Sequence, residues 1–167
     1  MLAYLLLMVF PIVLISAAVS DLATLTIPNR LSVFLVVGFV PLVVVAGLPF
    51  QSVLMHLLAG SAVLVAGFLL FLARTLGGGD AKLMAAASLW IGLEHLPIFF
   101  LYLVVIGGIL AVTILLYRRL PAAATAMGPA WACRLHDKST GIPYGIAISG
   151  AALLALPQTE LYALVAG

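Results

Sequence analysis

Long uncharged runs of mostly apolar residues constrain this chain more than any other feature of its sequence. Residues 1–20, 31–73 and 96–117 contain no aspartate, glutamate, lysine or arginine. A helix that crosses the hydrocarbon core of a bilayer, about 30 Å thick, needs about 20 such residues. With 66% hydrophobic and 7% charged residues, the chain also lies outside the usage of soluble globular proteins. The sequence therefore predicts a polytopic integral membrane protein.

The apolar runs predict one membrane-embedded, all-α domain over residues 1–167, with six transmembrane helices. The run 31–73 is long enough for two spans, and residues 47–51 supply the turn between them because glycine and proline interrupt helices there. The segment 81–93 is shorter and covers only about 20 Å at 1.5 Å per residue. The expected spans are residues 1–20, 31–47, 52–73, 81–93, 96–117 and 142–160.

Residues 1–20 also have a feature of a secretory signal, because Ser16-Ala17-Ala18 is a small-x-small sequence after an apolar run. The run has no basic residues before it, and removing it would scatter the basic residues of the chain to both sides of the membrane. We therefore expect it to remain as the first helix.

The basic residues predict the orientation of the helices. With six spans, all seven fall in or beside connections on one side of the membrane, whereas the other side receives Glu94, His95 and Glu160. Basic connections stay in the cytoplasm, so both termini should be extracytoplasmic and the protein should lie in the cytoplasmic (inner) membrane. The basic residues form no patch, so nucleic acid is not an expected partner. They are Arg30, Arg74, Lys82, Arg118, Arg119, Arg134 and Lys138.

Asp21 and Asp80 are the candidate catalytic residues. Asp21 closes the first span and Asp80 precedes the fourth, so the predicted topology brings both to the cytoplasmic face. A carboxylate at membrane depth costs roughly 3 kcal/mol, which suggests chemistry, although both residues could simply flank their spans. Two facing carboxyl groups share a proton, so that one activates water while the other protonates a carbonyl oxygen and then a leaving amine. Aspartic proteases use this mechanism.

Three glycines precede Asp80, at positions 77–79. They remove every side chain where a substrate backbone could approach, and they permit positive φ angles. Irregular backbone at membrane depth is tolerated where it is buried in protein or lines a wet cavity, and the mouth of an active site meets this condition.

The motifs together resemble a known family. Residues 77–83, Gly-Gly-Gly-Asp-Ala-Lys-Leu, resemble the GxGD signature of membrane aspartyl proteases, and Asp21 with Ile27-Pro28-Asn29 resembles the other half of the site in type IV prepilin peptidases. Residues 142–145, Ile-Pro-Tyr-Gly, resemble the start of that family's last helix. The resemblance implies a GxGD protease-like helix bundle with Asp21 and Asp80 as catalytic residues. It implies weaker roles in substrate binding or site shape for Gly77, Gly78, Gly79, Lys82, Pro143, Tyr144 and Gly145.

The activity implied by the resemblance is removal of the short basic leader of prepilins or pseudopilins at the cytoplasmic face of the membrane. The expected partners are these precursors and membrane lipid. The compact size is similar to the short form associated with Flp-type tight-adherence pili. Longer relatives carry a cytoplasmic segment with paired cysteines and also methylate the new amino terminus, whereas this chain has one cysteine, Cys133.

No metal or cofactor is expected. The single cysteine excludes a cysteine-based zinc cluster, and His56, His95 and His136 fall in a span, an outer loop and an inner loop. We expect His56 to pack or hydrogen-bond between helices, and glycines within the spans, such as Gly60 and Gly67, to let helices approach closely. His136 lies in a long inner loop whose first half, 121–126, should be irregular or interfacial.

Two polar residues of the motifs, Lys82 and Asn29, also have structural interpretations. Lys82 lies two positions from Asp80, a spacing that does not place both on one face of a helix. It either anchors its helix at the membrane interface or contacts substrate. Asn29 should start the second span as a helix cap.

Two other classes of function remain open from the residues alone. A proton- or cation-coupled transporter also uses acidic residues in membrane helices, but it predicts aspartates near the midplane and repeated halves. A noncatalytic membrane component of a pilus or secretion assembly predicts that Asp21 and Asp80 each tolerate exchange to asparagine.

Overall fold

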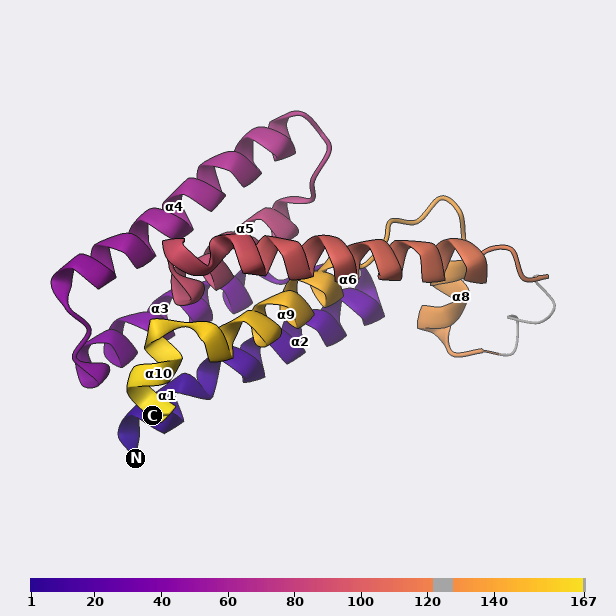
Figure 1. The fold of residues 1–167 in the computed structure, drawn as a ribbon. Coiled ribbons are helices and arrows are strands. Elements are labelled where there is room, and N and C mark those ends of the chain that lie inside the picture. Colours follow the sequence, from indigo (N-terminus) through magenta and orange to yellow (C-terminus); the bar gives the residue numbers. More distant parts are fainter. Residues whose placement is uncertain (122–127, 167) are drawn as a thin grey trace.

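The computed structural model describes residues 1–121 and 128–166, and all regular structure in these residues is helical (Figure 1), as predicted. The helices are α1 (Leu2–Leu7), α2 (Val9–Thr24), α3 (Asn29–Ala46), α4 (Phe50–Leu72), α5 (Gly78–Ile91), α6 (Leu96–Tyr117), α8 (Ala130–His136), α9 (Tyr144–Ala155) and α10 (Glu160–Ala166), with 3-10 turns at Leu93–His95 and Leu156–Gln158.

Four helical segments of the described residues are long and apolar enough to cross a membrane. They are Leu2–Thr24, Asn29–Ala46, Phe50–Leu72 and Leu93–Tyr117. The other two predicted spans are short. Helix α5 has 14 residues and α9 has 12, which gives lengths of roughly 21 and 18 Å. The predicted span 142–160 is not one helix, because a 3-10 turn follows α9. The lengths support a multi-pass membrane protein, and the count of six crossings stays a prediction.

The turn between α3 and α4 follows the prediction from glycine and proline. Helix α3 ends at Ala46, and Gly47 adopts the left-handed conformation, with a φ of 69°. The N–H groups of Gly47 and Leu48 donate to the carbonyls of Val44 and Val43. Pro49 then precedes the first residue of α4. This arrangement satisfies the last carbonyls of α3 while it reverses the chain.

Helix α5 lies at the centre of the bundle and packs against α3, α4, α6 and α9. Ten of its 14 residues are buried. The largest of them, Trp90, is fully buried and donates its Nε1–H to the Leu35 carbonyl at 2.9 Å. The Trp90 ring lies 5.0 Å from that of Phe10 and 6.0 Å from that of Phe39. One side chain of α5 therefore ties it to α2 and α3.

Helix α4 approaches α5 closely because glycines face it. A Cβ at Gly67 would lie 3.0 Å from the Cβ of Ala81, and a Cβ at Gly60 would lie 3.2 Å from that of Leu89. The prediction that these two glycines serve helix packing is confirmed.

The connection between α6 and α9 contains a helix that the sequence did not predict. Helix α8 is held against the end of α6, because the Tyr117 hydroxyl donates to the Ala132 carbonyl at 3.2 Å and the Tyr117 ring contacts His136 edge-on. The segment expected to be irregular, 121–126, lies almost wholly outside the described residues.

The contact at Gly67 generates a stability prediction. We expect Gly67→Leu to lower the stability of the folded protein by about 1–3 kcal/mol, because the added side chain overpacks the α4–α5 interface. A thermal unfolding scan in detergent measures this. Gly108→Leu in α6 is the matched control, since a Cβ there meets nothing within 4 Å. Equal melting of the two variants would contradict the packing role of Gly67.

Candidate functional site

Asp21 and Asp80 line one cavity of about 460 Å³. Asp21 lies in the last turn of α2, and Asp80 lies in the first turn of α5. The other residues that line the cavity are Leu25, Thr26, Ile27, Gly77, Gly78, Gly79, Gly141 and Ile142.

Asp21 is held by the start of α9. Its side chain is buried, with 5% of its surface exposed, and its Oδ2 accepts a hydrogen bond of 2.6 Å from the N–H of Gly145. The first N–H groups of a helix have no partner within the helix, so a carboxylate there satisfies one of them. The partial positive charge at the helix start also favours a negative group. This bond leaves Oδ1 as the oxygen of Asp21 that is available to a second group.

Gly145 has no room for a side chain. A Cβ at this position would lie 2.8 Å from Oδ2 of Asp21 and 2.9 Å from Cδ1 of Ile27. Its neighbours lie differently: Pro143 is the residue before the first turn of α9, and the Tyr144 ring contacts Gly107 on α6, outside the cavity lining. Of residues 143–145, the one that touches an aspartate is therefore Gly145.

Two of the three glycines before Asp80, Gly77 and Gly79, lie where a side chain would crowd its neighbours. A Cβ at Gly77 would lie 2.8 Å from Oδ2 of Asp80, and a Cβ at Gly79 would lie 3.2 Å from the Cβ of Ile27. The positive φ angles that glycine permits are not used here, because Gly77 has a φ of −68° and the next two residues are helical. The segment 25–27 can therefore lie directly against the start of α5.

Lys82 and Asn29 contact each other beside the cavity. The Lys82 ammonium donates to Oδ1 of Asn29 at 2.9 Å, and neither residue lines the cavity. The prediction that Asn29 caps its helix was wrong, because the residue before α3 is Pro28 and no side-chain cap is present. The amide of Asn29 instead binds a cation from the helix that carries Asp80.

A sharp turn after α2 shapes one wall of the cavity. Leu25 adopts the left-handed conformation, with a φ of 53°, and its N–H donates to the Asp21 carbonyl. A positive φ is uncommon for a branched apolar residue. The guanidinium of Arg134 in α8 donates to the Ala23 carbonyl, and the Ser20 hydroxyl donates to the Thr26 carbonyl at 3.0 Å. These bonds fix the turn that places Ile27 against Gly79.

Arg118 holds the opposite wall. Its guanidinium donates to the carbonyls of Leu135, Thr140 and Gly141 at 2.8, 2.9 and 3.2 Å. Gly141 lines the cavity and precedes the start of α9. The sequence identified Arg118 and Arg134 as orientation signals only, since their partners are carbonyls of a loop that has no recognisable motif.

Asp137 belongs to the same loop but not to the cavity. The backbone N–H and the hydroxyl of Ser139 both donate to its Oδ1 at 2.8 Å. These bonds hold the pKa of this exposed carboxyl below its usual range. Asp137 is therefore an ionised residue of the loop whose hydrogen bonds are local.

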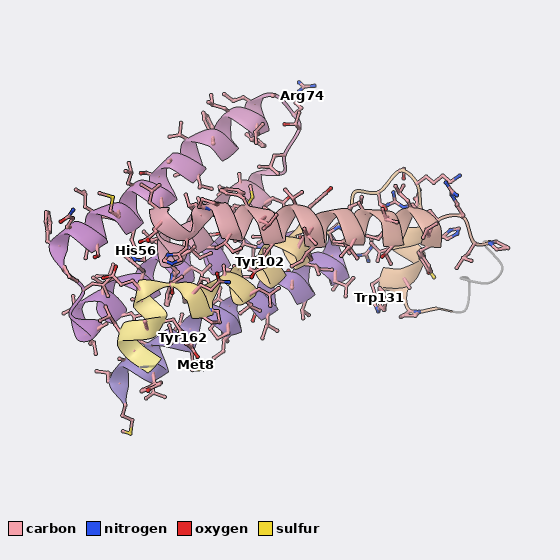
Figure 2. The ribbon with its side chains drawn as sticks, viewed as in Figure 1. Met8, His56, Arg74, Tyr102, Trp131 and Tyr162 are labelled. Atoms are coloured by element: carbon pink, nitrogen blue, oxygen red, sulfur yellow. The ribbon has the colours of Figure 1, made fainter. Side chains whose placement is uncertain are left out.

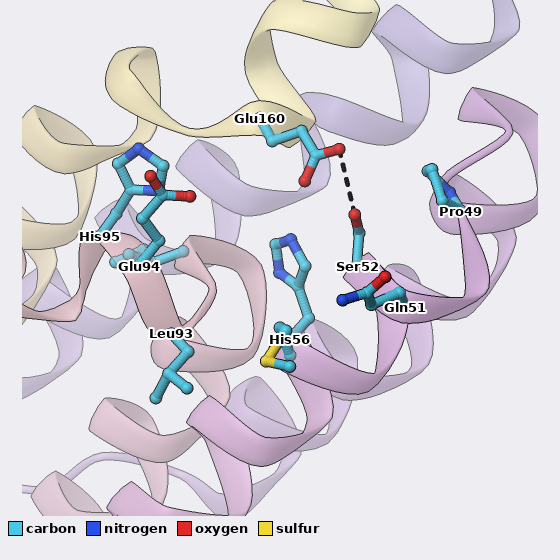
Figure 3. Close-up of a pocket in the computed structure, with 10 residues that line it drawn as sticks. Pro49, Gln51, Ser52, His56, Leu93, Glu94, His95 and Glu160 are labelled. Atoms are coloured by element: carbon cyan, nitrogen blue, oxygen red, sulfur yellow. Dashed lines mark hydrogen bonds between the residues drawn. The ribbon is translucent and has the colours of Figure 1, made fainter.

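A second cavity, of about 510 Å³, lies at the other end of α5, beside Ile91 (Figure 3). Glu94, His95 and Glu160 line it with His56, and the Ser52 hydroxyl donates to Glu160 at 3.1 Å. His56 lies within 2.8 Å of the Leu89 carbonyl through Nδ1, which confirms the predicted hydrogen bond between helices. Figure 2 shows Arg74 beyond the opposite end of α4. Glu94, His95 and Glu160 therefore lie at the other end of α5 from the aspartate cavity.

The profile of the type IV leader peptidase family matches residues 8–112. This range includes both aspartates and the three glycines and ends before α9. The comparison with curated proteins gave no match, and neither did the comparison with solved structures.

The contact between Gly145 and Asp21 generates a prediction about the site itself. In Gly145→Ala the added methyl group displaces the buried carboxylate, so we expect a water-soluble carbodiimide to label Asp21 several times faster, as measured by peptide mass spectrometry. Gly141→Ala is the control, because a Cβ there meets nothing within 4 Å. Unchanged labelling in Gly145→Ala would show that the carboxylate position does not depend on this glycine.

Proposed function

Because the chain belongs to the type IV leader peptidase family, we propose that it is an aspartic-type membrane endopeptidase, with Asp21 and Asp80 as its catalytic pair. Its substrates would be type IV prepilins or prepilin-like proteins, including those of Flp-type pili, whose short basic leader it removes. The observation that carries the proposal is the shared cavity, which is lined by two aspartates from separate helices.

The pair supports hydrolysis by activated water. Two carboxyl groups at close range hold one proton between them. The ionised carboxyl takes a proton from water as the water oxygen attacks the peptide carbonyl carbon, and the protonated carboxyl donates its proton to the carbonyl oxygen. The carbon–nitrogen bond then breaks as the amine nitrogen receives a proton. The reaction consumes one water and leaves the pair with its single proton.

The bare backbone around Asp80 suits a peptide substrate. Residues 77–79 and Gly141 line the cavity without side chains, so an extended peptide can approach the carboxyl groups closely. Ile27 and Ile142 give the cavity apolar walls, which exclude water from part of the site. Lower water content strengthens the electrostatic interactions on which such catalysis depends.

The position of the cavity fits a cytoplasmic leader. Arg118 and Arg134 lie around the aspartate end of the bundle, whereas Glu94 and Glu160 line the cavity at the other end of α5. By the positive-inside rule, the aspartate end faces the cytoplasm. The protein would therefore act at the inner membrane on precursors whose leader has not crossed it.

Exchange of either aspartate tests the mechanism. We expect Asp21→Asn and Asp80→Asn each to reduce leader cleavage at least about 10²-fold, because an amide keeps the size of the carboxyl group but cannot exchange its proton. Asp137→Asn is the matched control and should cleave normally, since its contacts are local to the loop. Abundance in the membrane should be unchanged in all three variants. Substantial cleavage by either aspartate variant would remove that residue from the pair.

The test of the proposed function is the intact mass of a candidate prepilin in a host that lacks other prepilin peptidases. Coexpression with the unaltered protein should remove the leader, whereas coexpression with Asp80→Asn should not. A further gain of about one methyl group would add methylation of the new amino terminus to the activity. Candidate precursors that all stay whole would refute the peptidase proposal, and ion or solute flux would then be measured.

A further inference from the structure

A groove opens between α3 and α4, over the surface of α5. Both helices pack on α5, and Figure 1 shows α4 leaning away from the rest of the bundle. The groove has a volume of about 590 Å³. Its lining comes from α3 (Asn29, Ser32, Val33 and Val36), α4 (Leu57, Gly60, Ser61 and Leu64) and α5 (Lys82, Ala85, Ala86 and Leu89).

A smaller cavity lies between this groove and the cavity of the aspartates and shares lining residues with both. It has a volume of about 270 Å³ and shares Leu64 and Lys82 with the groove. It also shares Gly78 with the cavity that contains Asp21 and Asp80. Shared lining residues therefore connect the groove, through the glycine segment, to the candidate catalytic site.

The walls of the groove are apolar. Val33, Val36, Leu57 and Leu64 expose 56%, 47%, 51% and 47% of their surface. The floor is formed by the small side chains of α5, which leave depth between the two walls. Such a surface fits the apolar side chains of a helix and would gain little from a polar peptide.

The end of the groove nearest Asp80 is polar. The Lys82 ammonium carries three donors, and one of them binds Asn29. Ser32 is more than nine-tenths buried, and its hydroxyl has no hydrogen-bond partner among the described residues. An occupant with free carbonyl or carboxylate oxygens at this end would satisfy both groups.

We propose that the groove holds an apolar helical segment of the membrane-inserted substrate, with the scissile bond reaching Asp80 past Gly78. This inference rests on the proposed function, because it concerns the substrate of that same site. The stretch of α5 from Lys82 to Leu89 is roughly 10 Å long, which corresponds to about two turns of a docked helix. The Lys82–Asn29 pair then meets the substrate where its backbone leaves helical structure and exposes its oxygens.

A bulky side chain in the groove tests the proposal. We expect Val36→Trp to raise KM for a membrane-inserted precursor about tenfold or more with a smaller change in kcat, because it fills space that the substrate helix needs. Val37→Trp is the matched control, since the adjacent valine is 60% exposed and does not line the groove. A short peptide that contains the cleavage site but lacks the apolar segment should be cut equally by both variants.

Photocrosslinking gives a second readout that does not depend on turnover. A benzophenone amino acid at position 36 of the Asp80→Asn protein should form an adduct with the precursor, whereas one at position 37 should not. The groove assignment would be overturned if adducts formed with lipid alone. It would also be overturned if the unaltered protein cleaved the precursor and Val36→Trp and Val37→Trp had equal KM values. Either result would leave the peptidase proposal intact. An unaltered protein that cuts no precursor would overturn both.

Discussion

The hydrogen bond between the Gly145 N–H and the Asp21 carboxylate is the contact on which the geometry of the site depends. It joins the end of α2 to the start of α9, two elements that are far apart in the sequence. Asp21 is almost fully buried, so loss of this donor would leave a buried acceptor without compensation, at a cost of about 1–3 kcal/mol. The same contact requires a residue without a side chain at position 145. Any change in how α9 begins therefore changes the position of the carboxylate.

Helix α5 organises the rest of the bundle because it is short, mostly buried and rich in alanine. Its small side chains allow α4 to approach through Gly60 and Gly67, and they leave room for the groove beside α3. Its two ends have different chemistry. The aspartate cavity lies at the amino end, and the cavity with His56 and two glutamates lies at the carboxyl end. A chain with few charged residues thus separates its polar sites along one central helix.

The sequence predicted the parts of this arrangement that follow from local pattern. Uncharged runs predicted the long helices, Gly47 predicted the turn after α3, and the order of spans predicted that Asp21 and Asp80 meet. The sequence was less informative where partners come from distant segments. Asn29 has the residue type of a cap, but a lysine 53 positions away binds its side chain. Glycine permits positive φ angles, but the close contacts of this segment are those of Gly77 with Asp80 and of Gly79 with Ile27. No local signal could identify these contacts, or the carbonyls that Arg118 binds, because they exist only after the helices pack.

In the proposed reaction, each aspartate has a helix start that favours its ionised form. Asp80 lies in the first turn of α5, and Asp21 accepts its bond from the first turn of α9. The partial positive charge at a helix start stabilises a nearby carboxylate by about 0.3–1 kcal/mol, and more where the site is partly buried. Because two ionised carboxylates in one cavity repel, one of them must hold the shared proton. Hydrolysis then requires each carboxyl group to give up a proton at one step and to accept one at another. The helix start beside each aspartate therefore lowers the cost of the ionised form through which that group passes.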